Sequence, residues 1–336
     1  MRPQLTGYWL VNMQLEKATR KRHEAMHVIS SLAFALAVFA ISLAMFEYAT
    51  GGDQLRYRAF YEGVPEVGIG DLLPYQYSII GSTEPLYALI AFLAAECLSK
   101  DVFASLLNGM FAYLTARYLF GLRMHWLVIV TLIFTNYYFF ALYLSHERLK
   151  FALIFVLLAI GTGKTRYAGL LLAPLAHVQV LLFYASAGVP YVLRRIPDVL
   201  LRWRIKKMDV LLMVVGMIVA LAAVSILGEH IAGKLMSYQN DDVFSLAKLL
   251  ALFTLALLVA RERMTCLFMF SPLFLAAFFV GDERVNIFGF FLFMYFSAQR
   301  RRGLNFPTLV LLGYFLLQGI EFMRKIIVFG DGYVPV

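Results

Sequence analysis

Residues 30–46 read SSLAFALAVFAISLAMF and contain no charged side chain. This run approaches the roughly 20 residues that a helix needs to cross about 30 Å of hydrocarbon. Similar apolar runs follow at 102–120, 126–144, 210–226, 246–260, 266–280 and 304–320. They are rich in Leu, Ala and Phe and do not alternate as strands do, so helices should satisfy the backbone in a bilayer. The sequence therefore predicts an all-α, polytopic transmembrane bundle of roughly 10–12 helices, with about ten or eleven crossings.

The composition supports a membrane protein. Of 336 residues, 61% are hydrophobic and 15% are charged, whereas about a quarter of a soluble domain is charged. Cys97 and Cys266 both lie in apolar helix candidates, so we expect neither a disulfide framework nor a metal site, and no cofactor. The net charge of +9 comes from discrete basic clusters, which in a membrane protein indicate topology rather than nucleic-acid binding.

The basic clusters predict the orientation of the chain. They comprise Lys17, Arg20, Lys21 and Arg22; Arg117 and Arg123; Lys164 and Arg166; Arg194, Arg195, Arg202, Arg204, Lys206 and Lys207; Arg261 and Arg263; and Arg300, Arg301 and Arg302. Placing all of them in the cytoplasm makes residues 1–27 a cytoplasmic N-terminus and residues 50–83 an outer loop. The outer segments then hold most of the acidic residues, and residues 1–336 form a single membrane domain.

Two segments do not fit simple crossings. Residues 167–193 would form a helix of roughly 40 Å, yet basic clusters flank both ends, so we expect two half-helices that turn near His177. Residues 85–98 are too short for an untilted span and are expected to be re-entrant or interfacial. Within the outer loop, residues 53–62 predict a short amphipathic helix with Asp53, Tyr57 and Tyr61 on one face.

Ionisable groups beside these apolar segments are the candidate site. The stretch Ser145–Lys150, SHERLK, supplies Glu147, Arg148 and Lys150, and a solvated turn is the alternative interpretation. Arginine forks bind phosphate in a bidentate manner, which favours a functional Arg148. His177 stands alone among apolar residues, where a hydrogen-bonded core histidine is the alternative.

A second charged turn, GDERVN at 281–286, supplies Asp282, Glu283 and Arg284, for which a local ion pair is the alternative. Two arginines, a histidine and nearby carboxylates suit glycosyl transfer from a polyprenyl pyrophosphate: arginine stabilises the departing pyrophosphate, and a carboxylate or histidine takes the proton of the acceptor hydroxyl. No metal is required. The GTGKT stretch at 161–165 lacks the spacing of a P-loop and is expected to be an inner turn. Residues 229–242 form a solvated outer loop on this scheme.

The order of these elements resembles a known family. Gly52-Asp53-Gln54-Leu55-Arg56-Tyr57 is followed by Thr83-Glu84-Pro85-Leu86-Tyr87, then by Ser145-His146-Glu147-Arg148-Leu149-Lys150, and then by Leu175-Ala176-His177. This order is similar to that of the EpsG/Wzy-type membrane polymerases of bacterial exopolysaccharide and O-antigen synthesis. Where that family commonly has Arg-Gln-Gly, this chain has Arg148-Leu149-Lys150.

The resemblance implies a polymerase in the bacterial inner membrane, with a GT-C-like architecture as one option. It would elongate an undecaprenyl-pyrophosphate-linked oligosaccharide at the periplasmic face, among membrane lipids and beside a chain-length regulator and a flippase. The candidate catalytic residues are then Arg148, His177, Glu84 and Glu147. Those for pyrophosphate or substrate are Arg148, Arg284, Lys150, Asp53, Arg56, Tyr57, Asp282 and Glu283.

Two other classes remain open from the sequence. A transporter or flippase of lipid-linked sugars would also use broken helices and a charged cavity. A membrane O-acetyltransferase, or a glycosyltransferase that adds a single sugar, would also place a carboxylate or histidine beside an anion site.

Overall fold

A computed structural model describes residues 5–161, 166–202, 243–280 and 282–334. Within these ranges the regular structure is entirely helical, which confirms the all-α prediction. The α-helices are α1 (Leu5–Met45), α2 (Gly52–Gly63), α3 (Leu72–Ile80), α4 (Pro85–Ala95), α5 (Lys100–Gly121), α6 (Trp126–Thr135), α7 (Tyr137–Leu144), α8 (Glu147–Gly161), α9 (Arg166–Ala176), α10 (Leu181–Arg202), α12 (Val243–Val259), α13 (Arg263–Val280), α14 (Asp282–Ala298) and α15 (Phe306–Phe329). Short 3₁₀ turns η1 (Val64–Glu66), η2 (Ile69–Asp71), η3 (Val178–Val180) and η4 (Arg301–Gly303) connect some of them.

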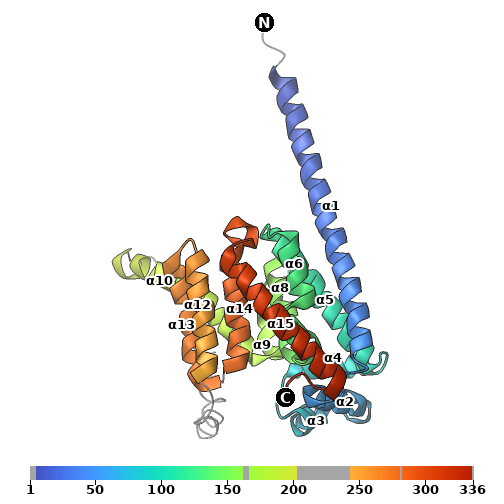
Figure 1. Cartoon of the computed structure of the whole chain (residues 1–336). Coiled ribbons are helices and arrows are strands. Elements are labelled where there is room, and N and C mark those ends of the chain that lie inside the picture. The colour runs from blue at the N-terminus through green and yellow to red at the C-terminus, as the bar shows by residue number, and fades with distance from the viewer. Residues whose placement is uncertain (1–4, 162–165, 203–242, 281, 335–336) are drawn as a thin grey trace. The chain divides into compact units, whose positions relative to one another are not determined.

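The chain divides into two compact units, and the prediction of a single membrane domain stays a prediction. Unit 1 comprises Met1–Val178 and Leu311–Val336, and unit 2 comprises Gln179–Val310. Figure 1 gives the helices of both, and each unit is described by itself below.

Unit 1 has two chemically distinct ends, which the antiparallel pair α1 and α5 defines. At one end His27 stacks on Phe120 with ring centroids 4.8 Å apart, and at the other Lys100 lies 4.5 Å from the ring centroid of Phe46. Between them a Cβ added at Gly109 would lie 3.0 Å from the carbonyl oxygen of Ala35, so the two backbones approach closely. Half-buried Arg117 of α5 and exposed Arg166 at the start of α9 lie toward the His27 end, and α8 begins at the Lys100 end.

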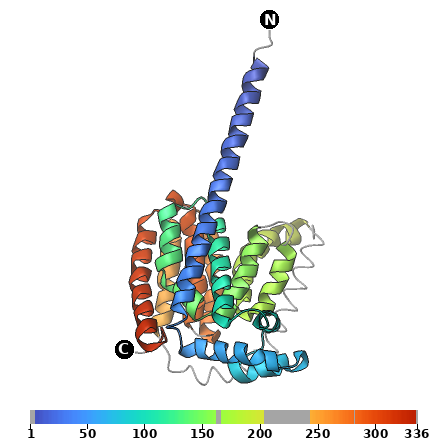
Figure 2. The ribbon, with the colours of Figure 1, turned by 90° about the vertical axis from the view of Figure 1, so that its right-hand side faces the viewer.

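Three short helices, α2, α3 and α4, cover the Lys100 end of unit 1. Figure 2 shows α2 and α3 lying crosswise beyond the end of α1. Helix α2 confirms the amphipathic helix predicted at 53–62: Tyr57 and Tyr61 are buried on its inner face, while Asp53 at its start is exposed. The predicted spacing of the three residues along one helix face is retained, and Asp53 at the exposed start of α2 keeps its carboxylate at the surface.

Within the described residues, two helices are long and apolar enough to cross a membrane. They are Glu24–Met45 and Arg301–Phe329, and the number rises to four if two bent helix pairs each count as one span. This is fewer than the ten or eleven crossings expected from the hydrophobic runs. Among the described helices, 126–144 breaks at Asn136 into α6 and α7, bent by 46°, and the apolar helices of unit 2 are short. The predicted run at 210–226 lies outside the described residues.

The break predicted near His177 is present, whereas the re-entrant or interfacial position predicted for residues 85–98 stays a prediction. Helix α9 ends at Ala176 and the 3₁₀ turn η3 precedes α10, so the interruption lies at His177 as predicted. Helix α4 is bent by 103° against Ile69–Ile80, so this pair does not form a straight crossing. Pro174 lies inside α9 and removes one N–H donor from its last turns.

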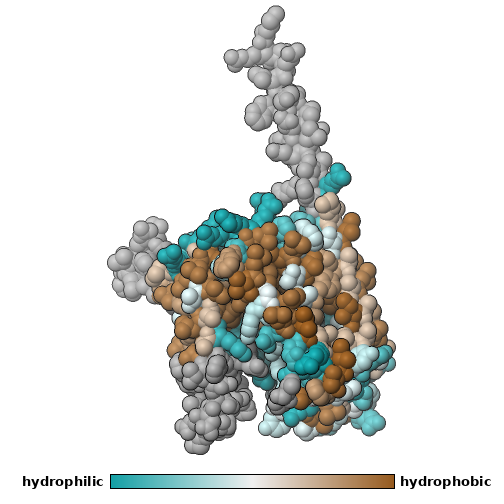
Figure 3. Space-filling view, in the orientation of Figure 1, coloured by the Kyte–Doolittle hydropathy of each residue, from teal (hydrophilic) through white to brown (hydrophobic). Residues whose placement is uncertain are grey.

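Unit 2 is built on α12, α13 and α14. Phe270, Phe288 and Phe293 are fully buried in its core, and α10 packs on α13. Leu250, Leu258 and other side chains of α12 and α13 face outward, and Figure 3 shows a broad apolar surface over these two helices. The predicted turn at 161–165 and the loop at 229–242 fall largely outside the described residues.

Candidate functional site

The backbone around Glu84 positions this residue independently of its side-chain contacts. It precedes Pro85, which favours the extended backbone observed at Glu84, with φ −116° and ψ 99°, and Pro85 opens α4 at a position that suits proline. The backbone N–H of Glu84 donates to Oε1 of Gln76 at 2.9 Å. Glu84 is 6% exposed, and its carboxylate contacts Arg148 of α8 and His177, which follows α9.

Arg148, in the first turn of α8, binds this carboxylate. Its Nη1 donates to Glu84 Oε1 at 2.8 Å and to Oε2 at 2.7 Å, and also contacts Ser82 Oγ. Ser82 Oγ donates to Glu84 Oε2 at 2.9 Å. Nε of Arg148 donates to the hydroxyl of Tyr57 at 3.1 Å. Within the described part of the chain Nη2 makes no hydrogen bond, so this nitrogen has capacity for a further acceptor.

His177 completes the cluster from the end of α9. Its Nδ1 lies 3.1 Å from Glu84 Oε1, and the side chain is largely buried. An ionised carboxylate can only accept, so Nδ1 carries the proton and Nε2 becomes the basic nitrogen of the ring. Glu84 thus orients the imidazole as the aspartate of a catalytic triad orients its histidine.

The electrostatics of the cluster keep Glu84 ionised. Glu84 lies in the segment between α3 and α4; burial raises the pKa of its carboxyl, but the hydrogen bond from His177 and the charge of Arg148 outweigh this and lower the pKa to about 2. Burial raises the pKa of Tyr57 on α2 to about 12, although the charge of Arg148 opposes that rise. Tyr57 is therefore a neutral hydroxyl at physiological pH and accepts from Arg148.

A second charged cluster lies in the interior of unit 1. Glu147 and Lys150 are 0% exposed; Glu147 Oε1 pairs with Lys100 Nζ at 2.7 Å, and its Oε2 accepts from Tyr87 at 3.0 Å. Lys150 donates to Asn108, whose amide donates to Ser42 Oγ at 2.9 Å and to the Tyr143 carbonyl at 3.1 Å. The sequence neighbours Glu147 and Arg148 therefore enter different networks, which the rings of Tyr57 and Tyr87, 6.0 Å apart, connect.

No protein-family profile, curated protein or solved structure matches the chain. Among the described residues, no group of three or more His, Cys, Asp or Glu side chains is arranged to hold a metal ion.

The structure brings together only part of the predicted site. Glu84, Arg148, His177 and Tyr57 meet in one cluster, as described above. Glu147 and Lys150 lie beneath it, and a pyrophosphate could contact Lys150 only if the interior opened.

The remaining predicted residues are dispersed. Asp53 and Arg56 are exposed on α2 and make no hydrogen bond or ion pair within the described residues. Arg284 is exposed on α14 in unit 2, so its position relative to Arg148 is not defined. The side chains of Asp282 and Glu283 lie outside the described residues.

Four supporting residues were not selected from the sequence. Ser82 and Gln76 hold Glu84, while Lys100 and Tyr87 hold Glu147. Tyr87 lies in the Thr83–Tyr87 motif quoted above, and that motif is a signal that could have indicated it.

The C-terminal segment also reaches this end of unit 1. The hydroxyl of Tyr333 lies 2.9 Å from Nε2 of His146, and Gly51 N–H donates to the Gly330 carbonyl at 2.9 Å. The described C-terminus therefore lies beside the start of α8, which the sequence left open.

Proposed function

We propose that this chain is a membrane glycosyltransferase that polymerises oligosaccharide repeats carried on a polyprenyl pyrophosphate. The observation that carries the proposal is the junction of Glu84, Arg148 and His177, which come from three separate segments and meet within hydrogen-bond distance at one end of unit 1. The family resemblance in the same three motifs supports it.

The chemistry assigns one task to each residue. Arg148 binds the pyrophosphate, which leaves with the electron pair of its bond to the anomeric carbon of the donor sugar. A hydroxyl of the acceptor repeat attacks that carbon, and Nε2 of His177 takes its proton. Glu84 is a positioning residue, because it holds Nδ1 of His177 and the guanidinium of Arg148. No metal enters the proposed reaction.

The wider setting belongs to the same proposal. We infer a GT-C-like arrangement in the bacterial inner membrane, with the cluster at the periplasmic face and the basic ends of α5 and α9 toward the cytoplasm. A flippase would deliver the repeats, and a chain-length regulator would act on the product.

A deletion strain complemented with variants tests the proposal. Arg148→Ala should abolish long polymer while protein level and single lipid-linked repeats stay unchanged. Arg56→Ala, which removes an exposed arginine of α2 outside the cluster, is the matched control and should retain polymer. Long polymer in the Arg148→Ala strain would refute the proposed role.

A flippase for lipid-linked sugars is the second candidate. The helix break at Asn136, buried between α6 and α7, favours it, because transporters use discontinuous helices at membrane depth. Purified protein in liposomes distinguishes the two: a flippase moves the lipid-linked repeat unchanged, whereas the polymerase lengthens it without a gradient.

A further inference from the structure

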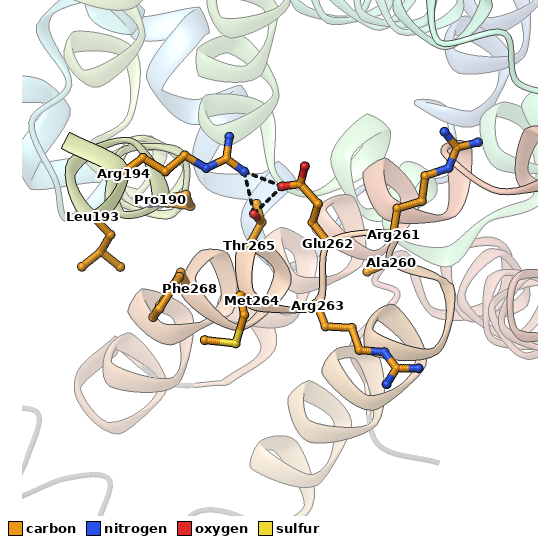
Figure 4. A pocket seen from close by; sticks show the side chains of 10 residues that line it. All are labelled: Pro190, Leu193, Arg194, Ala260, Arg261, Glu262, Arg263, Met264, Thr265 and Phe268. Carbon is orange, nitrogen blue, oxygen red and sulfur yellow. Dashed lines mark hydrogen bonds and ion pairs between the residues drawn. The ribbon is translucent and has the colours of Figure 1, made fainter. Parts of the chain in front are cut away.

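Unit 2 has a cavity at its arginine-rich end, in the angle between α10 and the α12–α13 turn. Its volume is about 810 Å³, and it is open to the surface. Figure 4 shows Arg194 reaching from α10 toward Glu262 and Thr265, while Arg261 and Arg263 extend from the turn on the other side of Glu262. Arg194 contacts Glu262 and Thr265, whereas Figure 4 shows the guanidinium groups of Arg261 and Arg263 directed away from Arg194. With three arginines and one glutamate among the lining residues, the rim is electropositive.

The walls of the cavity are apolar below this charged rim. Pro190 and Leu193 come from α10, and Met264 and Phe268 from the first two turns of α13. Met264 is 61% exposed, and the outer face of α13 continues apolar beyond it. The cavity thus joins a cationic rim to a hydrocarbon-like surface, which is the boundary where lipid headgroups lie.

Arg194 can exchange its ion-pair partner, Glu262, for a bound anionic ligand. Arg194 pairs with Glu262 and donates to Thr265 Oγ1 at 2.9 Å, but both ionic side chains are about two-thirds exposed, at 64% and 65%. Exposed ion pairs of this kind contribute little stability, so a more highly charged acceptor can replace Glu262. A guanidinium fork and a threonine hydroxyl are donors that suit phosphate oxygens.

We propose that this cavity binds the phosphate headgroup of an anionic membrane lipid, with the lipid chain lying along Leu193, Met264 and Phe268. The site is separate from the Glu84 cluster and does not depend on the polymerase reaction. Its ligand class is a phosphate-bearing amphiphile, which includes both anionic phospholipids and polyprenyl phosphates.

The test is native mass spectrometry of the full-length protein with added lipid. Phosphatidylglycerol should remain bound at concentrations at which zwitterionic phosphatidylcholine does not. The double variant Arg261→Gln/Arg263→Gln should weaken phosphatidylglycerol binding by about tenfold, since it removes two of the three positive charges that line the cavity. Arg194→Gln should act in the same direction.

The matched control is Arg301→Gln/Arg302→Gln. Both arginines are exposed in η4 of the same unit, the charge removed is identical, and neither lines the cavity. Equal weakening by the two double variants would overturn the proposal, because it would show attraction by overall charge. Competition between undecaprenyl phosphate and phosphatidylglycerol then identifies which lipid supplies the preferred headgroup. Displacement of either lipid by inorganic phosphate at equal concentration would also overturn the proposal, because it would show that the lipid chain contributes nothing to binding.

Discussion

Arg148 donates from one nitrogen, Nη1, to both carboxylate oxygens of Glu84, at 2.8 and 2.7 Å. The charges of the two residues therefore balance, while Nη2 makes no hydrogen bond within the described residues and can donate to a ligand. An arriving pyrophosphate would meet an arginine already oriented by Glu84, Ser82 and Tyr57. This arrangement favours binding through the guanidinium plane rather than through charge alone.

Replacing the planar guanidinium group of Arg148 by the ammonium group of lysine tests whether the geometry of the guanidinium group is needed. Arg148→Lys keeps the positive charge but cannot donate to Glu84 and Tyr57 with a rigid planar group. We expect polymer synthesis to fall on the order of tenfold or more, with Arg148→Ala lower still. Polymer yield per unit of membrane protein is the measurement, and full activity of Arg148→Lys would show that charge alone suffices.

Glu84 predicts a pH dependence of stability. Its folded pKa of about 2 lies below the ordinary value of 4.5, so its stabilising contribution is complete above about pH 4.5 and is lost as pH falls toward 2. The difference in thermal midpoint between wild type and Glu84→Gln should be constant from neutral pH to about pH 5 and should shrink below that. Measurement in detergent by intrinsic fluorescence suffices, and a difference that grows on acidification contradicts the assignment.

The buried cluster predicts a non-additive stability effect. Glu147→Leu leaves Lys100 and Lys150 in the interior without a carboxylate, a change that typically costs about 3–5 kcal/mol. Adding Lys100→Met and Lys150→Met removes the uncompensated charges, so the triple variant should be more stable than the single one. The measurement is the thermal midpoint of the Glu147→Leu variant and of the triple variant. A lower midpoint for the triple variant would show that the two lysines stabilise the fold through other contacts.

Close packing at Gly319 predicts that alanine substitutions at Gly319 and Gly313 change the stability of the protein differently. A Cβ there would lie 2.4 Å from the carbonyl oxygen of Thr135, beside the break between α6 and α7, whereas Gly313 on the same helix has open space around it. Gly319→Ala should destabilise by roughly 1–3 kcal/mol, and Gly313→Ala should be neutral or slightly stabilising because alanine favours helix. Equal thermal midpoints for the two variants would contradict the close approach.

Local signals in the sequence predicted several features of unit 1. The break at His177 followed from a length argument, since residues 167–193 are too long to lie between two basic clusters on one side. The amphipathic helix at 53–62 followed from its polar composition and helical spacing. The extended backbone at Glu84 is what Pro85 dictates, so the position of this carboxylate at a helix start was also accessible.

Long-range pairing was not accessible from the same signals. Nothing near Lys100 indicates that it faces Glu147 rather than water, because the pair forms only when α5 packs on α8. The sequence neighbours Glu147 and Arg148 looked like one charged turn, yet their positions on the helix direct them into different environments. Likewise, the contact of Tyr333 with His146 joins residues far apart in the chain and has no local signature.

The proposal that the Glu84, Arg148 and His177 cluster elongates a lipid-linked glycan is tested most directly with purified protein in liposomes. The measurement is the length of the lipid-linked oligosaccharide after incubation with no ion gradient. We predict longer products with wild type and with Arg56→Ala, and none with Arg148→Ala or His177→Ala. Lipid-linked repeats that cross the bilayer unchanged in length, or elongation that persists in Arg148→Ala, would contradict the proposal.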